Sequence, residues 1–167
     1  MSKSITEEMV KDVIKEWARN KAENGEIIFD ETFCGGKFVR YKTDKMTLLI
    51  PDNIEGKLSG WKRPDHYAYE IKCNQTILNL MLTFSYTNIS DETKKICEKL
   101  WNNFKMMPKM DTENSGDNYF RLCIYDANIK EYNEKEIYEA MDKLFYQMKG
   151  YEAVSYTHLT LPTNSRV

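Results

Sequence analysis

Two short motifs carry the residue types of a metal-dependent phosphodiesterase. Pro51-Asp52 is followed, after seventeen intervening residues, by Glu70-Ile71-Lys72. Carboxylates on neighbouring strands can share one or two magnesium ions, and a lysine two residues beyond the glutamate lies on the same strand face. Its ammonium could orient or activate the water that attacks a phosphodiester. Asp52, Glu70 and Lys72 are therefore the candidate catalytic residues, and Asp52 and Glu70 the candidate Mg²⁺ ligands.

The same motif has an interpretation that involves no catalysis. Glu70 and Lys72 alternate with apolar neighbours, as the solvated face of a half-buried strand does. Asn74-Gln75 then predicts a tight hairpin into another strand. Short degenerate motifs also arise by chance in charged chains. We favour this interpretation, in which the chain has no catalytic residue, metal ligand or cofactor of its own.

A second set of side chains places cations beside aromatic rings. Cations can contact phosphates and an indole can stack on a base, which is the composition that a nucleic-acid contact needs. The candidate nucleic-acid-binding residues are Arg40, Lys57, Trp61, Lys62 and Arg63. Trp61 lies between Gly60 and Pro64, however, and we favour a role as loop anchor over a binding role.

Composition limits the remaining chemistry. The chain has 167 residues, of which 41% are hydrophobic, and this is enough for one core. Its 24 basic and 26 acidic residues give a net charge of -2, so the chain has no overall positive charge that would hold nucleic acid or lipid by bulk attraction. Four separated cysteines and two histidines do not have the spacing of a zinc ribbon or a disulfide scaffold. Because no apolar stretch could span a membrane and no cleavable signal opens the chain, we expect a cytoplasmic protein without a membrane partner.

Hydrophobic periodicity predicts a single α+β domain over residues 1–152. Ser4 and Glu7 form a capping box for a first helix that ends at Asn24-Gly25, and further helices begin at Ser90 and Asn133. The order is α-β-β-β-β-β-α-β-α: a largely antiparallel sheet of about six strands, with three helices on one face. The strands are expected around residues 27–29, 38–41, 46–50, 67–71, 78–84 and 119–125, and residues 109–118 are expected to form a loop.

The end of the chain resembles translated sequencing adapter. Residues 154–163 read V-S-Y-T-H-L-T-L-P-T, which corresponds letter for letter to a transposase-type adapter. The resemblance implies that residues 153–167 are not native and that the chain comes from a bacterial metagenomic sequence whose true C-terminus is lost. The alternative is a genuine strand, since Val154, Tyr156 and Leu159 could sit on a sheet.

Several blocks in the right order resemble a known family. These are Cys34-Gly-Gly-Lys-Phe-Val-Arg-Tyr-Lys-Thr-Asp-Lys-Met, Leu49-Ile-Pro, Ser59-Gly-Trp and Asp65-His-Tyr-Ala-Tyr-Glu-Ile. They are similar to the C-terminal region of bacterial PD-(D/E)XK nuclease-family proteins, which follows the nuclease domain. The likeness spans roughly residues 30 to 150. The family pattern has no lysine at the position of Lys72, which argues against a catalytic role for it.

The resemblance implies a non-catalytic accessory domain that serves nucleic-acid binding or assembly in bacterial defence or DNA processing. Either the gene encodes a stand-alone copy of the accessory domain, or Met1 is an internal methionine of a longer gene. We favour the second, in which a nuclease domain missing from this fragment is the expected partner. Two alternatives remain open. One is a compact Mg²⁺-dependent nuclease that uses Asp52, Glu70 and Lys72, and the other is a protein-interaction module without nucleic-acid contact, which the net acidity favours.

Overall fold

The computed structural model describes residues 6–53, 56–74, 76–115, 118–126, 129 and 133–161. Within these residues the predicted α+β class is confirmed, with four α-helices and five strands in place of three and about six. In chain order the elements are α1 (Glu7–Glu23), a 3₁₀ helix η1 (Glu31–Phe33), β1 (Val39–Tyr41), α2 (Asp44–Leu49), β2 (Tyr67–Asn74), β3 (Ile77–Ser85), α3 (Asp91–Phe104), β4 (Asp111–Ser115), β5 (Tyr119–Asp126) and α4 (Glu134–Thr160).

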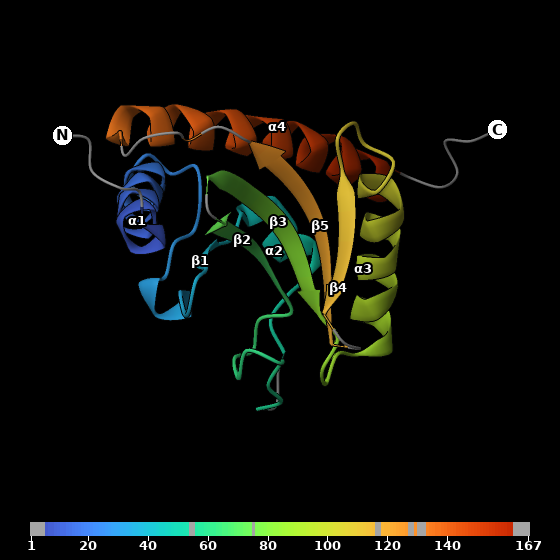
Figure 1. Cartoon of the computed structure of the whole chain (residues 1–167). Coiled ribbons are helices and arrows are strands. Elements are labelled where there is room, and N and C mark those ends of the chain that lie inside the picture. Colours follow the sequence, from blue (N-terminus) through green and yellow to red (C-terminus); the bar gives the residue numbers. More distant parts are fainter. Residues whose placement is uncertain are drawn as a thin grey trace.

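The strands form one antiparallel sheet in the order β1-β2-β3-β5-β4 (Figure 1). β2 and β3 are a hairpin in which Asn74 lies opposite Ile77, so the predicted reversal after Glu70-Ile71-Lys72 is confirmed. Gln75 itself lies outside the described residues. β5 pairs with β3 on one side and with β4 on the other. The short strand β1 and the polar strand β4 are therefore the two edges of the sheet.

The helices share one hydrophobic core with one face of the sheet. α1 contacts β1 and β2, α4 contacts β3 and β5, and the two helices contact each other where α4 crosses the sheet (Figure 1). Trp17 of α1 is fully buried at this junction, and its ring packs edge-on against Tyr41 of β1 and Phe145 of α4. Large aromatic side chains bury the most apolar area per residue, so this three-element contact is a main source of stability.

Residues 46–50 form a helix, and the strand predicted there is wrong. α2 begins after Thr43, whose hydroxyl accepts a hydrogen bond from the Met46 amide at 3.4 Å. The helix buries Met46 and leaves Leu48 73% exposed. Alternation over five residues cannot distinguish a short strand from a short helix, and here the Thr43 cap favours the helix.

Two further strand assignments also differ. Residues 27–29 form no regular strand, and a single bridge joins Ile28 to Lys42. The segment Asp111–Ser115, expected to be a loop, is the edge strand β4 and pairs with β5. Because its side chains are polar, and Asp111 to Asn114 are exposed, hydrophobic alternation cannot reveal this strand.

The predicted helix starts at Ser90 and Asn133 are confirmed, since each side chain accepts a hydrogen bond from the amide three residues later. Ser4 lies outside the described residues, and Thr6 caps α1. α4 continues through most of the adapter-like segment to Thr160. None of the described helices has the length and apolar character that crossing a bilayer requires.

Candidate functional site

The sheet face opposite the helices carries a buried group of charges around Glu70. Both oxygens of the Glu70 carboxylate accept hydrogen bonds. Oε2 accepts from Arg40 Nε at 2.7 Å, and Oε1 accepts from Arg121 Nε at 3.1 Å and from Thr83 Oγ1 at 2.6 Å. The Glu70 side chain is fully buried, and the two arginine side chains are 11% and 10% exposed. We call Arg40, Glu70, Thr83 and Arg121 the glutamate cluster.

Strand register brings the glutamate cluster together. Arg40 lies directly opposite Glu70 in the β1–β2 pair, and Thr83 lies directly opposite Arg121 in the β3–β5 pair. Because successive strand residues point to opposite faces, the four side chains share the face away from the core. Four different strands thus contribute one side chain each to one buried network.

Aromatic rings surround the two guanidinium groups. Arg40 lies 5.1 Å from the ring centroid of Phe38 and 5.7 Å from that of Trp61, and Arg121 lies 5.6 Å from that of Phe38. Lys72 also reaches this ring, with its ammonium 5.7 Å from the Phe38 centroid. Cations over ring faces are stabilised by the ring quadrupole, which holds these side chains in place.

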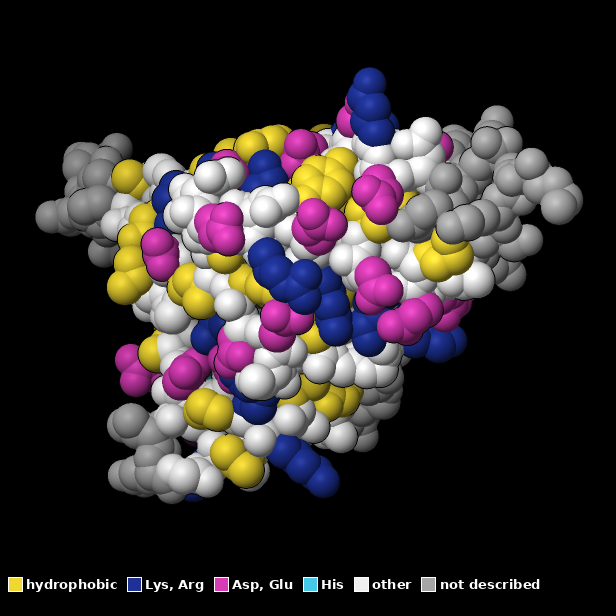
Figure 2. Space-filling view, turned by 90° about the vertical axis from the view of Figure 1, so that its left-hand side faces the viewer, with side chains coloured by type: hydrophobic (Ala, Val, Ile, Leu, Met, Phe, Trp, Pro, Cys, Tyr) yellow, Lys and Arg dark blue, Asp and Glu magenta, His cyan; other side chains and the backbone are white. Residues whose placement is uncertain are grey.

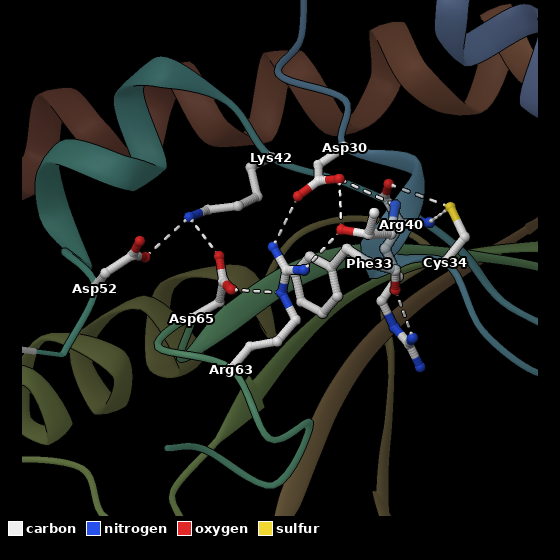
Figure 3. A network of polar contacts seen from close by, with 9 residues as sticks. Asp30, Phe33, Cys34, Arg40, Lys42, Asp52, Arg63 and Asp65 are labelled. Carbon is white, nitrogen blue, oxygen red and sulfur yellow. Dashed lines mark hydrogen bonds and ion pairs between the residues drawn. The ribbon is translucent and has the colours of Figure 1, made fainter. Parts of the chain in front are cut away.

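A second charge network adjoins the first (Figure 3). Lys42 Nζ bridges Asp65 Oδ1 at 2.8 Å and Asp52 Oδ1 at 3.1 Å, while Arg63 Nε donates to Asp65 Oδ2 at 2.9 Å and Arg63 Nη2 pairs with Asp30 at 3.1 Å. Burial by itself raises the pKa of Asp65, but the hydrogen bonds and charges of Lys42 and Arg63 outweigh it, so the pKa lies below its usual value. We call these five residues the aspartate network.

The structure separates the candidate catalytic residues: Glu70 belongs to the glutamate cluster, Asp52 to the aspartate network, and Lys72 to neither. Glu70 and Lys72 share a strand face, as predicted, but Asp52 follows α2 and binds Lys42. The environment of Glu70 does not fit Mg²⁺, because two guanidinium groups occupy its oxygens and would repel a dication. The described part of the chain contains no group of three or more His, Cys, Asp or Glu side chains that could hold a metal ion.

The candidate nucleic-acid-binding residues are divided as well. Arg40 and Arg63 are engaged in ion pairs, whereas Lys57 and Lys62 are exposed. Lys62 has a φ of 59°, and hydrogen bonds between Ser59 and both Lys62 and Arg63 close the turn that presents its side chain. The region therefore offers fewer free cations than the sequence suggests.

Trp61 packs against the protein in the manner of a loop anchor. Its ring lies edge-on to Phe33, with centroids 5.3 Å apart, and 5.5 Å from Tyr119. The preceding Gly60 donates its amide to Ser85 Oγ at 2.9 Å, and a Cβ at this position would lie 2.6 Å from the Tyr119 hydroxyl. The loop thus approaches the sheet so closely that a side chain at position 60 would have to displace the Tyr119 ring.

Sequence reasoning missed Thr83 and Arg121 as members of the glutamate cluster. Both alternate with apolar residues on predicted strands, which places each of them on the polar face. What the sequence does not reveal is that β5 pairs with β3, because α3 and β4 lie between them along the chain. Long-range pairing is thus what makes the cluster.

Charges on one face of the molecule are mixed in sign. On the face shown in Figure 2, Lys and Arg side chains lie among Asp and Glu side chains rather than in a patch of one sign. Such a surface attracts neither polyanions nor polycations over long range.

The chain matches no protein-family model and no curated protein. Among solved structures it is similar to a crystal structure of YbjN from E. coli, which is described provisionally as a transcription regulator. The likeness covers 90% of this chain and 95% of that chain, with 10% sequence identity and a TM-score of 0.44. Similarity at this level assigns no family.

Proposed function

We propose that this chain is a non-catalytic accessory domain of a PD-(D/E)XK nuclease-like protein, with a cytoplasmic location and a binding role. One observation carries the non-catalytic part: both oxygens of the Glu70 carboxylate are bonded to groups of the same chain. A carboxylate whose two oxygens are held by two guanidinium groups is unsuited to bind Mg²⁺. The binding role rests on the family likeness of the sequence together with the exposed lysines near Trp61.

Nuclease activity is the first test. The purified chain with Mg²⁺ or Mn²⁺ is expected to leave single- and double-stranded DNA and RNA uncut in a gel assay. Asp52→Ala and Lys72→Ala are suitable variants, because neither residue lies in the core and the Asp52 side chain is 48% exposed. Cleavage by the parent chain that disappears in both variants would replace this proposal with the compact nuclease.

We further propose that nucleic acid is bound weakly through the exposed lysines of the loop around Trp61. Lys57 and Lys62 are exposed there, while Trp61 holds the loop against Phe33 and Tyr119. A loop already fixed in place loses little conformational freedom on binding. Arg63 is left out of the proposed contact, because it is paired with Asp30 and Asp65.

The salt dependence of binding tests this contact. For a labelled single-stranded DNA, the double variant Lys57→Ala, Lys62→Asn should reduce the slope of log K against log salt by up to about 1.4, which corresponds to two phosphate contacts. Asn is chosen because it tolerates the positive φ of Lys62. The matched control is Lys95→Ala, Lys99→Ala on the exposed face of α3. An equal slope in parent and loop variant argues against this contact.

A protein-interaction module is the second candidate, and an aromatic hollow favours it. Tyr86, Trp101 and Phe120 line an open depression of about 490 Å³ beside α3, with ring centroids of Tyr86 and Phe120 4.7 Å apart. Aromatic side chains at such hollows are typical anchors of protein interfaces. Absence of DNA binding by the parent chain at low salt would favour this candidate over the first.

A further inference from the structure

A cavity unrelated to the predicted site lies between α4, the start of α2 and the β1–β2 edge. Its volume is about 280 Å³, just below the range of roughly 300–1,000 Å³ typical of pockets for drug-sized ligands. The residues on which the argument rests are Tyr41, Thr43, Tyr69, Phe145, Met148 and Glu152. The cavity therefore combines an aromatic lining with one buried acidic side chain, Glu152. The other charged side chains of the lining, Glu26, Asp44, Lys45 and Lys149, are half-buried or exposed.

Glu152 is the unusual member of this lining. It is only 5% exposed, and its Oε1 accepts hydrogen bonds from Thr43 Oγ1 and, at 2.8 Å, from the Tyr69 hydroxyl. Its Oε2 accepts no hydrogen bond from the described residues, and none of their cations forms an ion pair with it. The carboxylate is thus oriented by neutral donors and lacks a counter-charge within the described chain.

The other buried acidic residues of the described sheet region differ in this respect. Glu70 is neutralised by Arg40 and Arg121, and Asp65 by Lys42 and Arg63. Removing a carboxylate from water is costly unless a cation compensates for the lost hydration. A bound cation would neutralise the Glu152 carboxylate, as pairs of basic side chains neutralise the carboxylates of Glu70 and Asp65.

The aromatic rings of the cavity favour an organic cation over a metal ion. Tyr41 and Tyr69 are stacked with centroids 5.0 Å apart, and Phe145 lies edge-on to Tyr41 at 5.9 Å. Rings of this kind attract ammonium groups, whereas Mg²⁺ and Ca²⁺ need several oxygen ligands. Burial, and then the charge of Glu152, raise the pKa of Tyr69 well above its usual value, so its hydroxyl stays a donor at neutral pH.

Charges at the rim do not convert the cavity into an anion site. Lys149 lies 3.9 Å from Glu26, and Lys45 lies over the ring of Tyr156 at 5.7 Å. An anion that reached the floor would meet the Glu152 carboxylate and be repelled. The lining therefore discriminates between ligands of opposite charge.

We propose that this cavity binds a small organic cation with a primary ammonium group, which donates to the free oxygen of Glu152 while its alkyl chain packs on Tyr41, Tyr69 and Phe145. The inference is independent of the accessory-domain proposal, because it uses the opposite side of the sheet from the glutamate cluster.

Calorimetric titration of the full chain with butane-1,4-diamine tests the proposal, with butane-1,4-diol and succinate as neutral and anionic probes of similar length. Binding of the diamine alone is expected, and Glu152→Gln should weaken it at least tenfold because it removes the charge and keeps the shape. Glu139→Gln, at an exposed position of the same helix, is the matched control and should bind like the parent. No diamine binding, or equal binding by the Glu152→Gln chain, would overturn the proposal.

A second measurement locates the ligand in the parent chain, whether or not Glu152→Gln folds. With the methionine methyl groups labelled with ¹³C, the diamine should shift the signal of Met148, which lines the cavity, and leave that of the exposed Met106 unchanged. A Met148 signal that does not move while the diamine binds would place the ligand elsewhere and reject this site.

Discussion

Arg40 and Glu70 face each other across the β1–β2 pair, and the Arg40 Nε–H group donates to Glu70 Oε2 at 2.7 Å in a nearly water-free setting. Glu70, a candidate catalytic residue, therefore has a structural role, because both oxygens of its carboxylate are bonded to Arg40, Thr83 and Arg121. Its consequences for stability can be measured.

Glu70→Gln should lower the free energy of unfolding by about 3–5 kcal/mol, because two buried guanidinium groups lose their counter-charge. Urea denaturation of the parent and variant measures this difference. The matched control is Lys72→Ala on the same strand face, which is expected to cost less than about 1 kcal/mol. A loss below about 1 kcal/mol in Glu70→Gln would mean that the cluster contributes little.

Trp61→Ala should destabilise the fold by about 2 kcal/mol, because the ring contacts with Phe33 and Tyr119 are lost and a gap remains under the loop. Trp61→Phe keeps part of these contacts and should cost less than half as much. Thermal unfolding followed by circular dichroism measures both. A variant Trp61→Ala as stable as the parent, with weakened DNA binding, would instead assign Trp61 to stacking on a base.

Asp65→Asn should be less stable than the parent at neutral pH, and the difference should shrink in acid. The pKa of Asp65 is lower in the folded than in the unfolded chain, where it is about 3.9. The carboxylate therefore stabilises the fold above about pH 4, and this contribution is lost as pH falls through the lower, folded value. Urea midpoints of both chains between about pH 7 and pH 2.5 test this, and a constant difference across that interval would contradict it.

Deleting residues 153–167 should leave a cooperatively folding domain. Of the described residues beyond Glu152, only Ser155 is fully buried, and Leu159 packs on the core in part. The loss is expected to be about 1–2 kcal/mol, which lowers the melting temperature by roughly 3–6 °C in a domain of this size. Leu159→Ala in the full chain should account for about half of it. Loss of the cooperative transition would mean that the tail is integral to the fold.

The sequence by itself determined the elements whose signals are local. Apolar spacing predicts α1, capping residues predict the starts of α3 and α4, and Asn74-Gln75 predicts the β2–β3 hairpin, because each signal lies within a few residues of the feature it specifies. Alternation also placed Glu70 and Lys72 on one face.

Tertiary structure decided the features that depend on distant partners. The helix α2 packs against α4, about one hundred residues further along the chain, and Asp111–Ser115 becomes a strand because β5 pairs with it. The roles of Arg40 and Glu70 were undetermined for the same reason. The charge of a side chain follows from its residue type, but whether that charge can bind a ligand depends on which strands lie beside it. Here β5 brings Arg121, fifty-one residues further along the chain, into contact with Glu70.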